Sequence, residues 1–193
     1  MITFSKQQKI PFKGPIEPLY QGKNVSINKW KDWEVVNQKD FVVVLPYFKD
    51  ESYFLLRQEP TPYKLKYQND PNMRNIDKFL TLIGGSMEEG ENALQSLRRE
   101  MYEESGIVLS NLYEVEIPEP LFLNKNGIYQ VYPFLLELDY NSYKQVRFGG
   151  DGSKNEKLSM CVKVNLSDID EIKVHDVLTE YMLMKLKLKI KEK

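Results

Sequence analysis

Residues 85–107 limit the possible folds of this chain more than any other stretch. Most of the stretch has a helix-forming composition, and Gly106 suits the left-handed position that ends a helix. At 100° per residue, Glu100, Glu103 and Glu104 fall within about 100° of arc on one helix face. Like charges one turn apart repel each other, so this cluster is expected to be neutralised by cations.

Apolar side chains accompany the acidic cluster on the same predicted helix. Leu94, Leu97 and Met101 form a stripe beside the three glutamates. The carboxylates are therefore expected at the margin of the buried face, where repulsion costs more than in water. The stretch contains no histidine and no cysteine. A set of oxygen ligands alone favours Mg²⁺ or Mn²⁺ over Zn²⁺.

The same residues follow a known spacing pattern at every fixed position. The pattern is Gly-x5-Glu-x7-Arg-Glu-U-x-Glu-Glu-x-Gly-U, where U is apolar, and here it runs from Gly85 to Ile107. With average composition, a chance match is on the order of 10⁻⁷. The chain thus resembles the Nudix hydrolases. The resemblance implies an α+β fold, an α/β/α sandwich in which helices flank a mixed sheet.

The resemblance also implies a chemistry. Nudix enzymes split a nucleoside diphosphate linked to another moiety, and divalent ions bound by the motif activate water and offset charge on the pyrophosphate. Glu100 and Glu104 would be the principal ligands of Mg²⁺ or Mn²⁺, and Glu103 would assist. Glu103 and Glu104 would also serve in catalysis. The backbone carbonyl of Gly84 or Gly85 would be a further ligand.

Two more roles follow from the resemblance. Arg99 and Glu91 would form an ion pair that holds the loop-helix-loop together. The polar loop before residue 158 would carry a catalytic acid, for which Glu156 is the best match and Asp151 the runner-up. A carboxylate there could act as general base or as an extra metal ligand.

Three features resemble the group that cleaves ADP-ribose and nucleoside-diphosphate sugars: the loop before residue 158, the run at residues 55–58, and an N-terminal extension containing Trp30 and Trp33. Arg57 and Trp33 are predicted to bind substrate, and Trp33 could stack on a base. The alternative for both tryptophans is packing in the core or at a dimer interface. Triphosphates, dinucleotides and capped RNA are alternative substrates, and a non-catalytic nucleotide sensor is an alternative function.

The rest of the sequence predicts a Nudix domain over residues 38–193, preceded by an extended arm over residues 1–37 that could contact a second subunit. Alternating and β-branched residues predict strands, and helix-forming runs predict two helices. The expected strands are 40–48, 53–58, 79–83, 113–123, 128–138 and 158–164, and the expected helices are 91–105 and 167–188. The turn-forming residues 124–127 predict a hairpin of 113–123 with 128–138. Alternation along 158–164 places Met160 on the buried side of a half-buried strand. Pro133 places its strand at an edge or a bulge. Ser167 and Asp170 resemble a capping box.

Composition narrows the function classes. The chain has 27 basic and 28 acidic residues, a balance that argues against a general nucleic-acid-binding surface. The single cysteine, Cys161, cannot form an internal disulfide. With no long apolar run and no signal peptide, we expect a cytoplasmic protein that binds a small nucleotide, does not contact membranes, and forms a homodimer. His175, the only histidine, is expected to pack or lie at the surface.

Overall fold

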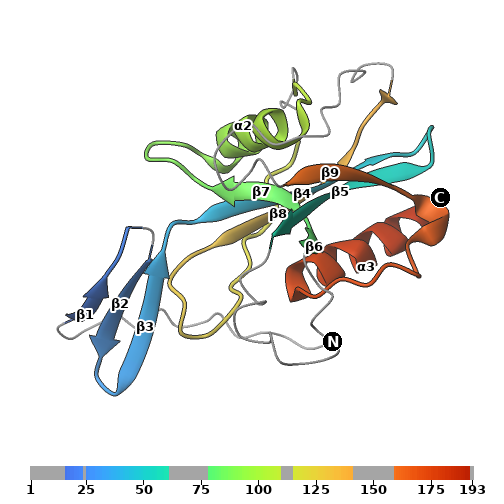
Figure 1. Cartoon of the computed structure of the whole chain (residues 1–193). Helices are drawn as coiled ribbons and strands as arrows, with labels where there is room; N and C mark the ends of the chain where they lie inside the picture. The colour runs from blue at the N-terminus through green and yellow to red at the C-terminus, as the bar shows by residue number, and fades with distance from the viewer. Residues whose placement is uncertain (1–15, 24, 61–77, 110–114, 141–158, 192–193) are drawn as a thin grey trace, which may run out of the picture. The chain divides into compact units, whose positions relative to one another are not determined.

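The computed structural model describes residues 16–23, 25–60, 78–109, 115–140 and 159–191 (Figure 1). The chain divides into two compact units. The first is Met1–Lys39 with Phe122–Tyr129, and the second is Asp40–Leu121 with Gln130–Lys193. Each is described by itself.

The first unit contains an antiparallel three-stranded sheet in the order β1-β2-β3. Its strands are β1 (Glu17–Gln21), β2 (Val25–Trp30) and β3 (Trp33–Gln38). Trp30 and Trp33 pair across the β2–β3 turn. The 122–129 loop joins this unit through Val36, whose N–H donates to the Asn126 carbonyl at 2.8 Å. The predicted arm therefore contains a small sheet.

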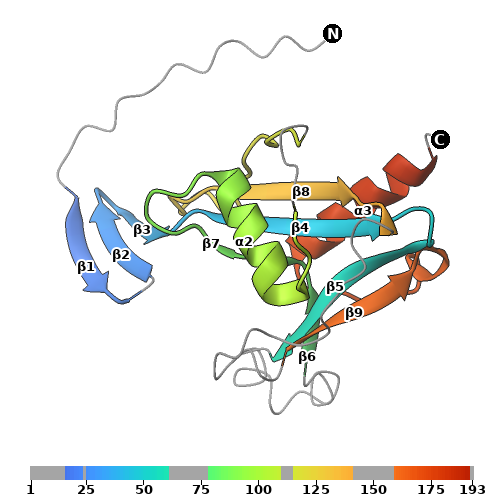
Figure 2. The ribbon, with the colours of Figure 1, turned by 90° about the horizontal axis from the view of Figure 1, so that it is seen from above.

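The second unit is built on a six-stranded mixed sheet with one α-helix on each face (Figures 1 and 2). The strands are β4 (Phe41–Phe48), β5 (Tyr53–Pro60), β6 (Lys78–Thr81), β7 (Ile83–Ser86), β8 (Val131–Glu137) and β9 (Met160–Asn165). The helices are α2 (Ala93–Ser105) and α3 (Val177–Lys191), with the short 3₁₀ turn η3 (Leu166–Asp168) after β9. This arrangement confirms the α+β fold class.

The central strand is β4. Along one edge it pairs antiparallel with β7 and then with β5, and along the other it pairs parallel with β8. Strand β5 carries the sheet on to β6 and β9. Seven of the eight residues of β4 are buried, which is the pattern of a strand covered on both faces. Figure 2 shows α2 crossing over this part of the sheet.

The predicted hairpin of residues 113–123 and 128–138 forms only in part. Within the described part of that segment, Leu121 and Val131 form one antiparallel bridge, in which each N–H donates to the other residue's carbonyl, at 2.8 and 3.0 Å. Along its other edge β8 pairs with β4, and this pairing places Phe134 and Leu136 in the core. Among the described strands β4 is the only partner of β8, an edge position that agrees with Pro133.

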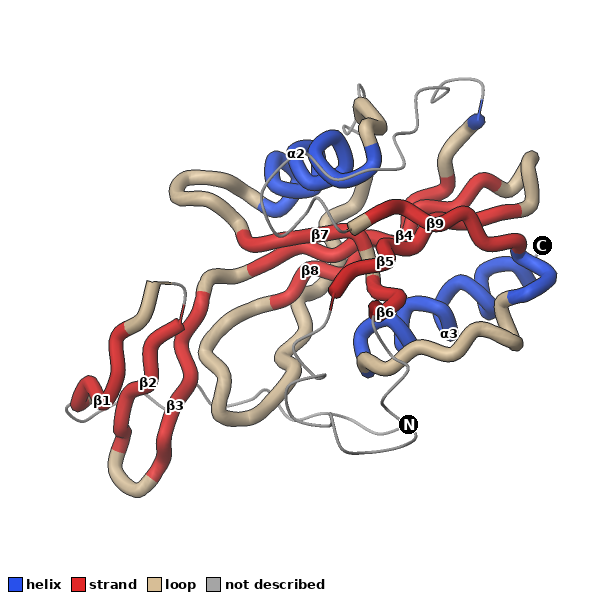
Figure 3. The backbone as a smooth tube through the Cα atoms, in the orientation of Figure 1, coloured by secondary structure: helices blue, strands red, loops and turns tan. Residues whose placement is uncertain are grey.

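Two other strand predictions need adjustment. The single strand predicted at 79–83 is two strands, separated at Leu82, because β6 pairs with β5 and β7 with β4. In the strand predicted at 158–164, Met160 was expected on the buried side, yet it is exposed and Cys161 lies in the core. Helices cover both faces of the sheet, so simple alternation does not identify the buried side there (Figure 3).

The predicted start of the last helix is also wrong. Ser167 lies in η3, and α3 begins at Val177, where the Asp176 carboxylate accepts a hydrogen bond from the Thr179 N–H at 2.8 Å. A capping box uses Glu or Gln, whereas the shorter Asp170 pairs with Lys187 of α3 instead. No helix in the described residues is long and apolar enough to cross a membrane.

Candidate active site

Helix α2 brings the acidic cluster against the sheet. Asn92 caps its N-terminus in a reciprocal capping box with Gln95, and Gly106 ends it in the left-handed conformation. Its apolar stripe enters the core as predicted, and two of the three glutamates go with it. Glu100 is 6% exposed and Glu104 is 9% exposed. They therefore lie within the buried face, deeper than the margin expected from the helical spacing.

Arg99 connects the start of the motif to its acidic cluster. Its Nε and Nη2 donate to the two carboxylate oxygens of Glu91, each at 2.9 Å. Its Nη1 donates to Glu100 at 2.5 Å and to Glu103 at 3.1 Å. Its Nη2 also donates to the Ser86 carbonyl at 2.9 Å. The Arg99–Glu91 pair expected from the motif is thus one part of a larger network.

This network sets the charge of the carboxylates around it. The hydrogen bond from Arg99 lowers the pKa of Glu91 to about 2. Burial raises the pKa of Glu100, and the bond from Arg99 opposes that shift. Arg99 itself stays charged, because its bond to Glu91 raises its pKa further.

Glu104 has a different arginine. Arg57 of β5 forms an ion pair with it, with Nη1 2.6 Å from Glu104 Oε1, and the Gly84 N–H of β7 donates to Oε2 at 2.9 Å. Burial raises the pKa of Glu104 to about 8, against the lowering effect of Arg57 and Gly84. This pair was not expected from the sequence. A usable signal was present, since alternation along β5 puts Arg57 on the same side as the core residue Leu55.

Two glycines let β7 pass close to its neighbours. A side chain at Gly84 would overlap the backbone of Val42 and Val43, and Gly84 has φ +154°. A side chain at Gly85 would overlap the carboxylate of Glu100. The Gly85 backbone therefore lies directly against that carboxylate.

The model of the NUDIX domain family matches residues 37–159, which is more than half of the 193 residues. This chain belongs to the Nudix family. The activity of Nudix hydrolases is hydrolysis of pyrophosphate bonds in nucleotides, generally with a divalent metal such as Mg²⁺. A search of curated proteins found no match.

The residues of this Nudix motif fit a hard cation. Glu100 lies against Gly85, and Glu104 lies against Gly84, so two carboxylates meet successive residues of one strand. In the described residues each oxygen of Glu104 has one protein partner, Arg57 at Oε1 and the Gly84 N–H at Oε2, and it keeps a lone pair for another. Within the described residues, no three acidic, histidine or cysteine side chains converge as a ready-made metal site. Two carboxylates with backbone oxygens and water are a usual set for Mg²⁺.

The other predicted site residues lie elsewhere. Glu156 and Asp151 fall outside the described residues. Trp33 belongs to the first unit, where it is 43% exposed and lines a cavity of about 230 Å³ with Trp30. Lys125 lies over its ring at 4.5 Å.

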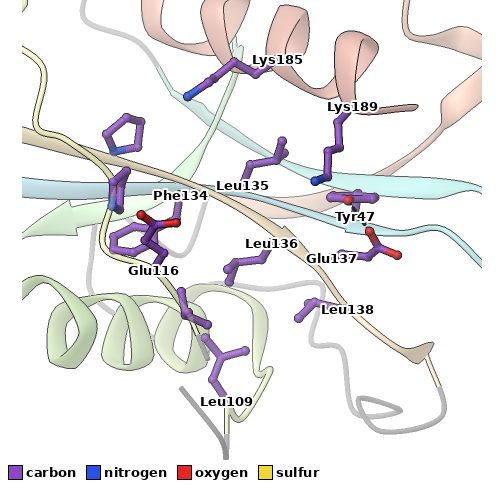
Figure 4. Close-up of a pocket in the computed structure, with 13 residues that line it drawn as sticks. Tyr47, Leu109, Glu116, Phe134, Leu135, Leu136, Glu137, Leu138, Lys185 and Lys189 are labelled. Carbon is purple, nitrogen blue, oxygen red and sulfur yellow. Dashed lines mark hydrogen bonds between the residues drawn. The ribbon is translucent and has the colours of Figure 1, made fainter. Parts of the chain in front are cut away.

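A cavity of about 670 Å³ in the second unit runs along β8 (Figure 4). Lys185 and Lys189 point toward it from α3, and the Tyr47 hydroxyl donates to Glu137 at 2.6 Å beside it. No glutamate of the motif lines this cavity. The candidate active site is therefore the surface between α2 and β7.

Proposed function

We propose that this protein hydrolyses the pyrophosphate bond of a nucleoside diphosphate linked to a second moiety, with ADP-ribose or a nucleoside-diphosphate sugar as the favoured substrate. The supporting observation is the complete motif gathered between α2 and β7. Glu100, Glu104 and the carbonyl of Gly85 would hold Mg²⁺ or Mn²⁺, and Glu103 would assist from the more exposed edge. Such an ion lowers the pKa of bound water and offsets phosphate charge.

The protein's own groups prepare the site for that chemistry. Arg99 ties Glu100 and Glu103 to the loop that begins the motif, through Glu91 and the Ser86 carbonyl. Fixed carboxylates do not have to reorganise when substrate binds, and this preorganisation is a main source of rate enhancement.

Glu156 is the proposed general base. Glu156→Gln should lower kcat by roughly 10²–10⁴-fold with little change in thermal stability, because the substitution removes proton transfer and keeps the shape of the side chain. Asp151→Asn is the matched control and should have a much smaller effect. If Glu156→Gln loses less than about threefold in kcat, the base is Asp151 or a glutamate of the motif.

Trp33 is the proposed substrate contact. For Trp33 the support is its exposed ring, beside a cavity whose wall includes Asn126. The buried Oδ1 of Asn126 has no hydrogen-bond partner in the described structure, so it could accept from an amino group of a base. Stacking on an aromatic ring contributes about 1–3 kcal/mol, so Trp33→Ala should raise KM by about tenfold or more and leave kcat nearly unchanged.

A substrate panel tests the proposed function. ADP-ribose, nucleoside-diphosphate sugars, dinucleotides, nucleoside triphosphates and capped RNA are incubated with Mg²⁺ or Mn²⁺, and products are separated by chromatography. We expect metal-dependent cleavage of ADP-ribose or a nucleotide sugar, and none by Glu104→Gln. Cleavage of triphosphates, dinucleotides or capped RNA alone would favour those alternatives. Tight nucleotide binding without turnover between about pH 6 and 9 would favour the sensor.

A homodimer is the second proposal carried from the sequence. Its support is β1, every residue of which is exposed, including Leu19 and Tyr20. Exposed apolar groups on an edge strand commonly mark an interface. Light scattering coupled to size-exclusion chromatography should give twice the chain mass, and Leu19→Lys with Tyr20→Lys should give the chain mass alone.

A further inference from the structure

We propose that Arg57 is a positioning residue that fixes the orientation of the Glu104 carboxylate toward β7. The inference rests on the proposed function, in which Glu104 is a metal ligand. It differs from direct substrate contact, because Arg57 would act through Glu104.

The geometry of Arg57 supports this role. Its side chain is 4% exposed, and its Nη1 lies 2.6 Å from Glu104 Oε1. Its Nε lies 3.5 Å from Glu59 Oε2, an ion pair without a hydrogen bond to the buried Nε in the described residues. The planar guanidinium is thus buried beside two carboxylates, and its shape limits the directions in which it can face Glu104.

Glu104 is held from three elements at once. Arg57 on β5 takes one carboxylate oxygen, and Gly84 on β7 takes the other at 2.9 Å. The backbone carbonyl of Glu104 accepts from the thiol of Cys161 on β9 at 3.2 Å. With both oxygens engaged, the plane of the carboxylate is set, and the remaining lone pairs point in defined directions. Groups that orient ligands in this way affect metal affinity and activity by about 10- to 100-fold.

A positioning role and a purely electrostatic role predict opposite changes. Arg57 is a positive charge next to an expected cation site. If Arg57 contributed only its charge, removing that charge would tighten metal binding, because like charges repel. If Arg57 positions Glu104, its removal weakens metal binding although the repulsion is gone. A substrate-contact role predicts a third pattern, in which metal binding is unchanged and KM rises.

The experiment compares Arg57→Met, Arg57→Lys and Arg98→Met with the wild-type chain. Arg98 is exposed on the same helix as Glu104, so its replacement removes one positive charge from that helix and serves as the control for a change of charge alone. The Kd of Mn²⁺ is measured from the electron paramagnetic resonance signal of free Mn²⁺, and folding is checked by circular dichroism. The kcat and KM are then measured with ADP-ribose or the compound that the panel selects.

We expect the Kd of Mn²⁺ to rise about 10- to 100-fold in Arg57→Met, less in Arg57→Lys, and less than about twofold in Arg98→Met. The kcat should fall by about tenfold or more in Arg57→Met, with KM within about threefold of the wild type. If Arg57→Met does not fold, the Kd of Mn²⁺ in Arg57→Lys tests the proposal, because a single ammonium group cannot face both Glu104 and Glu59 as the guanidinium does.

A folded variant whose Kd for Mn²⁺ stays within about twofold of the wild type, or becomes lower, overturns the positioning role. A wild-type chain that binds Mn²⁺ but cleaves nothing in the panel refutes the proposed function alone, because the Mn²⁺ comparison still holds. A wild-type chain that does not bind Mn²⁺ refutes both.

Discussion

Replacing Glu91 by glutamine removes the charge that Arg99 holds most tightly. Both oxygens of Glu91 accept from Arg99 at 2.9 Å, and one of them also accepts from the Glu88 N–H. The change of pKa from 4.5 to about 2 corresponds to ~3 kcal/mol of stability at neutral pH. Because the pair borders solvent, screening and side-chain entropy reduce this value to about 1–2 kcal/mol.

The pH dependence has a definite sign. The folded-state pKa of Glu91 is depressed, so its contribution is complete above the unfolded pKa of about 4.5 and is lost as pH falls toward about 2. Glu91→Gln should therefore be less stable than the wild type by about 1–2 kcal/mol at pH 7. That corresponds to a melting temperature lower by about 2–8 °C for a chain of this size. The difference should shrink as pH drops below about 4.5.

Urea unfolding at several pH values measures this difference directly. Glu89→Gln is the control, because it removes an equal charge from an exposed side chain of the same loop. It should change stability by less than about 0.5 kcal/mol. Equal stability of Glu91→Gln and the wild type at pH 7 would refute the argument. So would a difference that persists unchanged at pH 3.5, because it would then come from packing and not from charge.

Three further outcomes follow from the structure. Gly85→Ala should lower the free energy of unfolding by about 1–3 kcal/mol and displace Glu100. The melting temperature and the activity should therefore fall together, and a variant with both unchanged would contradict the close contact. Burial raises the pKa of the Cys161 thiol to about 12, so an aromatic disulfide reagent at pH 8 should label it only when the protein unfolds. Rapid labelling of the folded protein would show that the thiol is not buried. Asp176→Ala should lower the free energy of unfolding in urea by about 1 kcal/mol, and Asp176→Asn should lower it much less. No loss in Asp176→Ala would show that Asp176 does not cap α3.

Local features of the sequence were enough to predict α2. Its cap residues and its apolar period act within a few positions, and the structure contains the helix with Gly106 at its end. The same locality limits what could be predicted around residues 113–138. Turn-forming residues at 124–127 favoured a hairpin, of which one bridge forms, but they gave no sign that β8 pairs in parallel with β4. Pairing between strands far apart in the chain leaves no local mark.

The candidate site shows the same difference between contacts that are local in the sequence and contacts that depend on the fold. Spacing placed Glu100 and Glu104 on one helix face, and the resemblance to the Nudix motif identified Arg99 and Glu91 as partners. It did not identify Arg57 as the partner of Glu104, because that contact depends on how β5 lies beneath α2. Charge partners from different elements require the tertiary fold, whereas the placement of carboxylates on one helix face requires only the helical period.

The parallel pairing of β4 with β8 has a consequence for synthesis of the chain. Tyr47 and Glu137 are paired although they are 90 residues apart. A ribosome adding about 5–20 residues per second needs roughly 5–18 s to cover that distance. During this interval one edge of β4, a run of valines flanked by aromatic residues, has no strand to pair with. The nascent protein therefore exposes an aggregation-prone edge until β8 emerges, and its yield should rise when a holding chaperone is co-expressed.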